Sequence, residues 1–298
     1  MLEQLDLENG IYLPEIFEEV KNKKARIGVA VEGGGLRGIV SATLLQILDE
    51  HDMRSRLKAI SGTSSGAINA AYFLNNKMDS LFRLYEKMAS KDFIQPWRWP
   101  NAMNLPFLFE EQVPKHHPLD WKLLRNHPIP FFISVTDIEN GKSEFHQAQS
   151  CKTDAELFAT IRASASAPLF CTNSETIGDR TFNDGHIHLA IPIGCFNPSQ
   201  IDIVFCLLTR EKGYKKKNTF SSWLLEKMAL RHQTEAYQLS FSNSSQTYND
   251  QIKTIEKEPL YLPIAIEPSD HLISKTCRNP EELHRCISST RDRFLKPL

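Results

Sequence analysis

A tight turn at residues 62–66, Gly-Thr-Ser-Ser-Gly, constrains the fold of this chain more than any other stretch. It follows a short apolar run, residues 57–60, and precedes residues 67–72, whose small and apolar side chains are typical of a helix. The G-x-S-x-G spacing in that context predicts a strand, a turn and a helix, with Ser64 at the strained centre of the turn. Its Oγ would then stand at the helix N-terminus, where partial positive charge favours an anion, while the Ser65 side chain points elsewhere.

Short apolar runs and helical patterns alternate along the rest of the chain. We expect strands at residues 25–31, 57–60, 130–138, 142–145, 201–208 and 260–266, with a hairpin turn at 139–141. Helical patterns cover residues 39–50, 67–74, 79–89, 153–164, 220–257 and 280–294. A capping box is expected at the start of the helix at 153–164, from Thr153 and Glu156. This alternation predicts an α/β fold with a largely parallel sheet.

A glycine-rich loop, residues 33–38, follows the first expected strand and opens a helix. Consecutive glycines let backbone N–H groups turn toward a bound anion, so Gly33, Gly34 and Gly35 are candidates for an oxyanion hole. A nucleotide-binding loop is the rival interpretation, because the segment loosely matches G-x-G-x-x-G. No G-K-[ST] follows, and the Ser64 turn lies about 30 residues on, so an oxyanion loop is favoured.

A serine nucleophile needs a base, and here the residues leave two alternatives open. A Ser-His-Asp triad would require a late histidine, but no spacing selects among His186, His188, His232, His271 and His284. The other candidate is Asp184, in an Asp-Gly turn that follows a strand-like segment and can aim a carboxylate at a site.

Composition limits the classes of function that remain. The chain has 298 residues, 41% hydrophobic and 24% charged, as in a soluble globular protein of one large or two modest domains. A net charge of −1 provides no bulk attraction to nucleic acid, so no nucleic-acid partner is expected. Six cysteines without a C-x-x-C pair predict reduced thiols and no zinc site. With no signal-type apolar segment, we expect a cytoplasmic or membrane-peripheral protein, while secretion by a signal-independent route stays open.

Four motifs in this order resemble the patatin-like phospholipase family: residues 33–38, residues 62–66, Ala-Ser-Ala-Ser-Ala-Pro at 163–168, and Asp184-Gly185. The segment at 207–217, LLTREKGYKKK, is similar to the bacterial patatin-like subgroup. The resemblance implies a modified α/β-hydrolase, a three-layer α/β/α fold with a largely parallel central sheet. It divides the chain into an N-terminal extension (1–24), a catalytic core (25–210) and a mainly helical C-terminal region (211–298).

The resemblance also implies roles for individual residues. Ser64 corresponds to the nucleophile and Asp184 to the base of a Ser–Asp dyad, with Gly33 to Gly35 as the oxyanion hole. Arg37 and Gly38 belong to the supporting loop, where Arg37 either forms a structural salt bridge or meets an anionic substrate. The family usually has a small residue where this chain has His186, which could crowd the turn or add a second titrating group. Neither a metal nor an organic cofactor is implied.

The function implied is a lipid acyl hydrolase, a phospholipase A or lysophospholipase, that acts on phospholipid or another acyl-ester lipid. The alternatives are a soluble carboxylesterase or thioesterase, and a non-catalytic membrane- or protein-binding module.

Two segments could contact a membrane. The lysines at 212, 215, 216 and 217 are either a solvated turn or a headgroup contact. Residues 92–110, rich in tryptophan, phenylalanine and proline, are either a packed surface loop or a lid facing lipid. Oligomeric state stays open.

Overall fold

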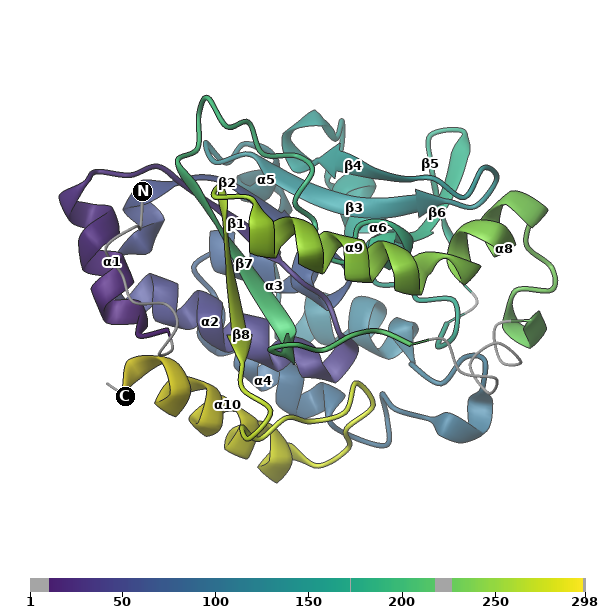
Figure 1. Cartoon of the computed structure of the whole chain (residues 1–298). Helices are drawn as coiled ribbons and strands as arrows, with labels where there is room; N and C mark the ends of the chain where they lie inside the picture. The colour runs from purple at the N-terminus through teal and green to yellow at the C-terminus, as the bar shows by residue number, and fades with distance from the viewer. Residues whose placement is uncertain (1–10, 172, 218–226, 297–298) are drawn as a thin grey trace.

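A mixed β-sheet forms the centre of the computed structural model, which describes residues 11–171, 173–217 and 227–296 (Figure 1). Within those ranges the strand order is β5-β6-β3-β2-β1-β7-β8, and β4 pairs with β3. The strands are β1 (Ile27–Val31), β2 (Leu57–Gly62), β3 (Phe131–Asp137), β4 (Ser143–Gln147), β5 (Glu175–Ile177), β6 (Arg180–Asp184), β7 (Ile203–Glu211) and β8 (Tyr261–Ile266). Pairing is parallel from β3 through β2, β1 and β7 to β8, and antiparallel around β4, β5 and β6. The expected largely parallel sheet is confirmed.

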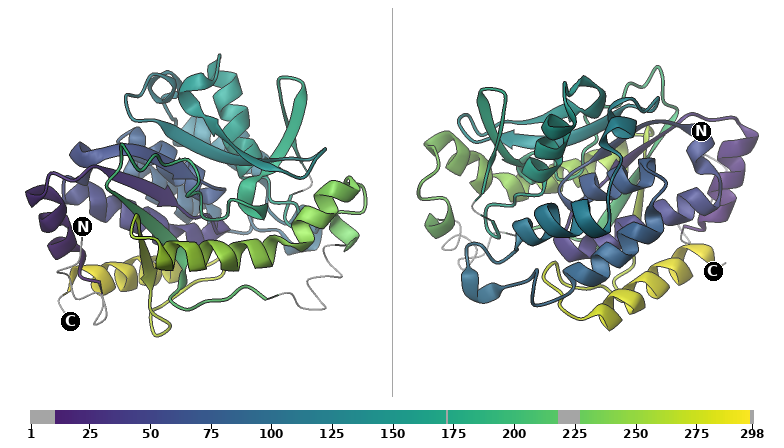
Figure 2. Two further views of the ribbon diagram at one scale, coloured as in Figure 1. Left: turned by 45° about the horizontal axis from the view of Figure 1, so that its top comes forward. Right: turned by 180° about the vertical axis from the view of Figure 1, so that it is seen from behind.

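Helices cover both faces of this sheet, which makes three layers (Figure 2). Those described are α1 (Leu13–Asn22), α2 (Ile39–Glu50), α3 (Ser65–Leu74), α4 (Met78–Met88), α5 (Trp121–Arg125), α6 (Asp154–Ser164), α8 (Glu235–Ser242), α9 (Ser244–Lys257) and α10 (Pro280–Leu295). Along β7 the side chains alternate between the two faces. Phe205 and Leu207 join the core beneath α2, whereas Val204 and Cys206 join the cluster that includes Tyr248 of α9. A strand buried on both faces needs a continuous apolar run, which is what residues 203–208 provide.

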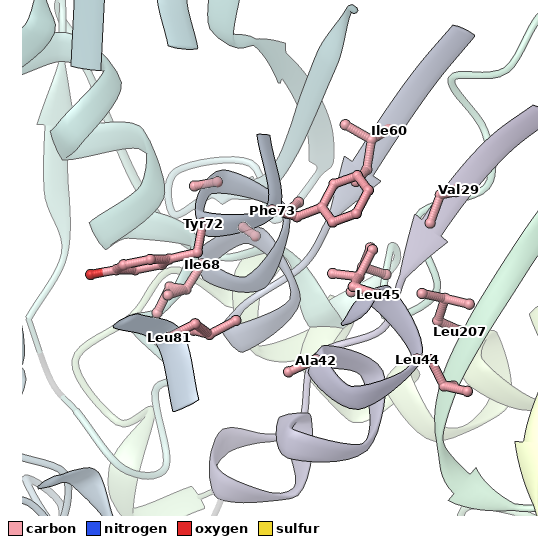
Figure 3. Close-up of a cluster of buried hydrophobic side chains, with 14 of the residues drawn as sticks. Val29, Ala42, Leu44, Leu45, Ile60, Ile68, Tyr72, Phe73, Leu81 and Leu207 are labelled. Atoms are coloured by element: carbon pink, nitrogen blue, oxygen red, sulfur yellow. The ribbon is translucent and has the colours of Figure 1, made fainter. Parts of the chain in front are cut away.

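The larger core lies between the sheet and the helices α2, α3 and α4. Figure 3 shows Leu45 of α2 and Phe73 of α3 lying against Val29, Ile60 and Leu207 of the sheet. Each is almost fully buried, and burying a side chain of this size stabilises the fold by roughly 1.5–3 kcal/mol. Because this packing fixes both β1 and β2 against α3, it also fixes where the turn between β2 and α3 lies.

Two expectations need adjustment in detail. Thr153 caps α6 as expected, since its Oγ1 accepts from the Glu156 N–H at 3.1 Å. The Glu156 carboxylate, however, accepts from the Lys152 N–H at 2.7 Å rather than from Thr153, so the reciprocal half of the capping box is shifted by one residue. The helical pattern at 220–257 is represented by α8 and α9, and its part at 218–226 lies outside the described residues.

The C-terminal region contributes more than helices. Its strand β8 pairs with β7 in parallel, with Phe205 opposite Leu262, so this region extends the central sheet. The helix α10 packs on α2, across the sheet from α9. In the part of the chain that the structure describes, no helix is both long and apolar enough to cross a bilayer.

Candidate active site

The turn at Ser64 has the conformation that its sequence predicts. Ser64 joins β2 to α3 with φ 56° and ψ −129°, a region that non-glycine residues rarely adopt and that costs about 1–3 kcal/mol. Its N–H donates to Ser164 Oγ at 2.9 Å, which helps to hold the turn. A Cβ at Gly66 would lie 2.2 Å from the Val31 carbonyl oxygen, so only glycine fits there. Ser64 is partly accessible, at the N-terminus of α3.

The glycine loop lies directly against Ser64. A Cβ at Gly33 would come within 2.6 Å of Ser64 Cβ, so the two backbones could not approach this closely with any other residue. Ser65 points away from Ser64, as expected, and its Oγ accepts from the Gly34 N–H at 2.9 Å. That bond occupies the amide of Gly34. The described residues offer no acceptor to the N–H groups of Gly33 and Gly35, which leaves those two free for an oxyanion.

Asp184 ends β6, where it pairs with Val135 of β3. Its side chain is almost completely buried, with 1% of the residue exposed, and Oδ1 accepts from the His186 N–H at 3.0 Å. The backbone is fixed as well, because Thr136 Oγ1 donates to the Asp184 carbonyl oxygen at 2.9 Å. A Cβ at Gly185 would lie 2.6 Å from the Ser134 carbonyl carbon. A glycine follows Asp184 because the Ser134 backbone comes this close, and not simply because the chain turns there.

Two contacts tie the serine turn to the aspartate turn. Thr63 Oγ1 and Ser134 Oγ share a hydrogen bond at 2.6 Å, and Ser134 lies against Gly185. The motif at 163–168 touches both candidates: Ser164 accepts from the Ser64 N–H at 2.9 Å, and the Ser166 carbonyl accepts from the Asp184 N–H at 3.3 Å. Residues separated by 120 positions in sequence are thereby held on one side of the sheet.

A cavity of about 270 Å³ brings most of the candidate residues together. Its lining includes Ser64, Asp184, Arg37 and the three glycines at 33–35. Gly38 does not line the cavity. It supports the glycine loop, because its carbonyl oxygen accepts a hydrogen bond from Asn69 Nδ2 of α3 at 2.8 Å. A broader cavity of about 670 Å³ lies along α10, beside Asp270 and Arg293, and contains none of the candidates.

Many of the residues that line the 270 Å³ cavity are apolar. Its lining includes Ile68, Met88, Phe93, Met103, Leu105, Leu108, Leu169, Phe170 and Phe241. Four of these belong to residues 92–110, so this segment forms part of the cavity wall rather than an isolated surface loop. Trp97 in the same segment is 67% exposed and lies outside the lining. The volume is slightly below the range of about 300–1,000 Å³ typical of ligand sites, so a two-chain lipid would extend beyond it.

The lining is also rich in cations: Arg37, Arg210, Lys216, Lys217 and Lys275. Burial, followed by repulsion from Arg210, lowers the pKa of Arg37. Burial and the neighbouring cations lower the pKa of Lys275 to about 8. The cluster of lysines expected at 212–217 divides here, because Lys216 and Lys217 line the cavity while Lys212 and Lys215 are exposed outside it.

Arg37 does not form the structural salt bridge considered from the sequence. It is 7% exposed, its Nε is buried without a hydrogen-bond partner, and no carboxylate within the described ranges pairs with it. The nearby acid is Glu32, whose carboxylate accepts from the Thr209 N–H. Burial raises the pKa of Glu32, and the Thr209 bond and the charge on Arg37 partly offset that rise.

His186 is the histidine that enters the cavity lining, out of the five considered as a base. Its Nδ1 lies 3.3 Å from Asp184 Oδ1 without making a hydrogen bond, and its ring packs edge-on against Phe241, with 5.5 Å between ring centroids. His271 and His284 instead pair with Glu282 and Glu86 near the surface. The turn therefore accommodates the larger residue without displacing Asp184 from the cavity.

The family model for patatin-like phospholipase matches residues 29–195, more than half of the chain. The chain belongs to the patatin-like phospholipase family. The matched segment includes both Ser64 and Asp184.

Among the solved structures that this patatin-like chain matches is the crystal structure of VipD from Legionella pneumophila, at 13% identity and a TM-score of 0.45. That match covers 90% of this chain and 66% of the VipD chain, so the chain spans just under two thirds of that structure. No protein of curated function matches the sequence.

Several site residues of this patatin-like protein escaped the sequence analysis. Ser164 stands in a motif that was noticed, but its bond to the Ser64 N–H needs tertiary contact to be seen. Asn69 and Tyr85 form a buried pair at 2.9 Å that supports the glycine loop, and nothing in their helical pattern marks them. Arg210 and Lys275 lie beyond the family match; Arg210 stands in the 207–217 segment singled out from the sequence, though not as a site residue, and nothing in the sequence marked Lys275. Within the described residues, no group of three or more His, Cys, Asp or Glu side chains could hold a metal ion.

Proposed function

We propose that this protein is a lipid acyl hydrolase of the phospholipase A or lysophospholipase type, working through Ser64 and Asp184. The observation that supports this most is that both residues and the glycine loop line one cavity, whose lining also contains many apolar side chains and five cations. An acyl chain suits the apolar lining, and a charged headgroup suits the cations. The substrate that matches both is an amphiphilic acyl ester.

The proposed reaction assigns a step to each of these groups. Ser64 Oγ attacks the ester carbonyl carbon while its proton passes to Asp184, whose Oδ1 is already bonded to the His186 N–H. The carbonyl oxygen becomes an oxyanion, stabilised by the N–H groups of Gly33 and Gly35 and by the N-terminus of α3. The intermediate then expels the alcohol, which takes the proton from Asp184 and leaves an acyl-enzyme.

Deacylation uses the same groups in the reverse direction. Water gives a proton to Asp184 and attacks the acyl carbon, and the oxyanion forms again in the same place. Collapse of this second intermediate breaks the bond to Ser64 Oγ, which recovers its proton from Asp184. The products are a fatty acid and the free enzyme, so one carboxylate acts as base and acid in turn.

The first test is fatty-acid release from phosphatidylcholine and lysophosphatidylcholine micelles by wild type, Ser64→Ala and Asp184→Asn. We expect release by wild type alone. Labelling of wild type, but not Ser64→Ala, by a fluorophosphonate probe would show independently that Ser64 is a nucleophile. Absence of both release and labelling would contradict the proposal and favour a non-catalytic binding module.

A soluble carboxylesterase or thioesterase is the second candidate, and the small volume of the cavity favours it. The two candidates differ in how rate depends on substrate concentration. For a lipid hydrolase the rate rises when a short-chain phospholipid passes its critical micelle concentration. For an enzyme of soluble esters it saturates below that point and does not rise again.

A further inference from the structure

Three cations reach the cavity from separate parts of the chain. Arg37 comes from the short helix after the glycine loop (Gly35–Gly38), Arg210 from the end of β7, and Lys275 from the segment between β8 and α10. Arg210 and Lys275 both lie outside the segment that defines the family, residues 29–195. Arg210 stands at the end of the expected core, within the 207–217 segment, whereas Lys275 belongs to the C-terminal region.

Within the described residues, these three cations are held in place without a direct ion pair. The Arg210 guanidinium lies 4.1 Å from the centre of the Tyr214 ring, and Lys275 Nζ lies 4.3 Å from that of Phe170. Arg37 Nε is buried with no hydrogen-bond partner. Among the ion pairs found in the described ranges, none involves any of the three. Aromatic faces orient a cation but leave its charge available to a ligand.

The cations also repel one another. Burial is the largest cause of the lowered pKa of Lys275, and Arg37, Lys216 and Arg210 lower it further, while Asp184 opposes the shift. Two carboxylates line the same cavity, Glu32 and Asp184, against five cations. Glu32 is already bonded to Thr209. A partly desolvated site with an excess of positive charge is stabilised when an anion enters it.

We propose that Arg37, Arg210 and Lys275 form a subsite for the phosphate of a lipid whose headgroup carries a net negative charge, such as phosphatidic acid. This inference rests on the proposed function and names the substrate class of the same site. Two guanidinium groups can each offer paired donors to phosphate oxygens, and the ammonium adds a point charge. A zwitterionic choline headgroup would bring a second cation toward the same cluster, which is unfavourable.

The subsite is built on the loop that would hold the oxyanion. The Leu36 N–H donates to the Lys275 carbonyl oxygen at 3.1 Å, so the segment that carries Lys275 is fastened to the glycine loop. The Arg37 Nε lies 3.5 Å from the position of a Cβ on Gly34. A phosphate bound here therefore sits beside the loop that contacts Ser64, and would position a glycerol ester near the nucleophile.

The test compares kcat/KM for phosphatidic acid and phosphatidylcholine with identical acyl chains, in mixed micelles of a neutral detergent. We expect wild type to prefer phosphatidic acid by at least about tenfold, because a charge-assisted hydrogen bond to a desolvated group is worth about that factor or more. Lys275→Met and Arg210→Gln should each reduce the ratio about tenfold. Lys275→Arg, which keeps the charge, should restore most of it.

Lys215→Met is the matched control. Lys215 stands next to Lys216 in sequence but is exposed and outside the cavity lining, so its loss removes the same charge from the surface only. We expect it to keep the wild-type ratio. An equal drop in Lys215→Met would mean that general attraction to the micelle surface sets the preference, and would overturn the subsite. Thermal unfolding of every variant checks that a lost ratio is not a lost fold.

A binding measurement separates this inference from the proposed function. Calorimetric titration of Ser64→Ala with dihexanoyl phosphatidic acid, dihexanoyl phosphatidylcholine and inorganic phosphate needs no turnover. We expect the phosphatidic acid to bind at least tenfold more tightly than either of the others, and Lys275→Met in the same background to abolish the difference. Equal affinity for inorganic phosphate would show a free-phosphate site, and equal affinity for both lipids would refute the subsite even if hydrolysis is observed.

Discussion

At the scale of single residues, the site depends on bonds that keep backbone groups in unusual positions. Ser64 has a positive φ, and the bond from its N–H to Ser164 Oγ is one of the contacts that compensates for that conformation. Asp184 is positioned in the same way, with its carboxylate receiving the N–H of the residue two positions on. The backbone N–H of His186 therefore holds the Asp184 carboxylate, and the imidazole side chain is not needed for that bond.

Asp184→Asn should reduce kcat by about 10²–10⁴-fold, because an amide cannot accept the Ser64 proton. His186→Ala keeps the backbone N–H that bonds to Asp184 and should reduce kcat by less than about tenfold. Steady-state hydrolysis of lysophosphatidylcholine measures both variants, with circular dichroism as the control for folding. Turnover retained in Asp184→Asn and lost in His186→Ala would make the histidine the base.

Ser164→Ala should destabilise the protein by about 1–3 kcal/mol, because it leaves the partly buried Ser64 N–H without an acceptor. Ser150→Ala is the control: Ser150 is exposed, and its loss should change the free energy of unfolding by less than about 0.5 kcal/mol. Urea denaturation followed by fluorescence gives both values. If the two variants were equally stable, the Ser164 bond would have no measurable role in holding the turn.

At the scale of elements, the segment at 92–110 contributes to the cavity wall, and its expected contact with lipid stays a prediction. Phe93, Met103, Leu105 and Leu108 pack into the cavity wall, while Trp97 is left exposed. No clean period appears in this sequence because its side chains face the cavity, the core and the surface in an irregular order. Pattern analysis works where one face of a regular element is buried, and this segment is not such an element.

Trp97→Ala should weaken binding to phospholipid vesicles by about tenfold or more, since burying a large apolar side chain contributes roughly 1.5–3 kcal/mol. Leu123→Ala, at an apolar side chain on α5 that is 39% exposed and outside the cavity lining, is the control and should bind as wild type does. Vesicle sedimentation measures binding, and hydrolysis of a soluble ester checks that the site is intact. Unchanged sedimentation of Trp97→Ala would mean that this segment does not contact lipid.

At the scale of the whole molecule, the cavity is assembled from both the family core and the C-terminal region. The core provides Ser64, the glycine loop and Asp184, and the region after β7 adds Lys216, Lys275, Phe241 and Tyr248 to the lining. Since β8 extends the central sheet, this region cannot be removed without exposing β7. The division at residue 210 expected from the sequence stays a prediction about domains, while the cavity spans it.

The preference for a net-negative headgroup should fall as pH rises through about 8, because Lys275 is charged below its pKa and neutral above it. The charged groups facing it are Arg37, Arg210, Lys216 and Asp184. This preference is measured as the ratio of kcat/KM for phosphatidylglycerol to that for phosphatidylcholine, from pH 6.5 to 9.5. Bound anionic lipid stabilises the charged lysine, so the midpoint of the fall in this ratio lies above the pKa of the free protein. Lys275→Arg should remove the step, and a ratio constant with pH in wild type would count against Lys275.

The sequence by itself determined the elements and the chemistry they carry. The apolar runs at residues 25–31 and 201–208 predict buried strands, and the glycines around Ser64 leave little choice of turn, because local sterics and apolar patterning are encoded in neighbouring residues. The tertiary structure alone decided which distant groups meet. It placed Ser164 Oγ against the Ser64 N–H, left Arg37 Nε buried without a hydrogen-bond partner among the described residues, and brought Lys275 into the cavity. Such contacts depend on how the sheet and helices pack, and no local pattern in the sequence records them.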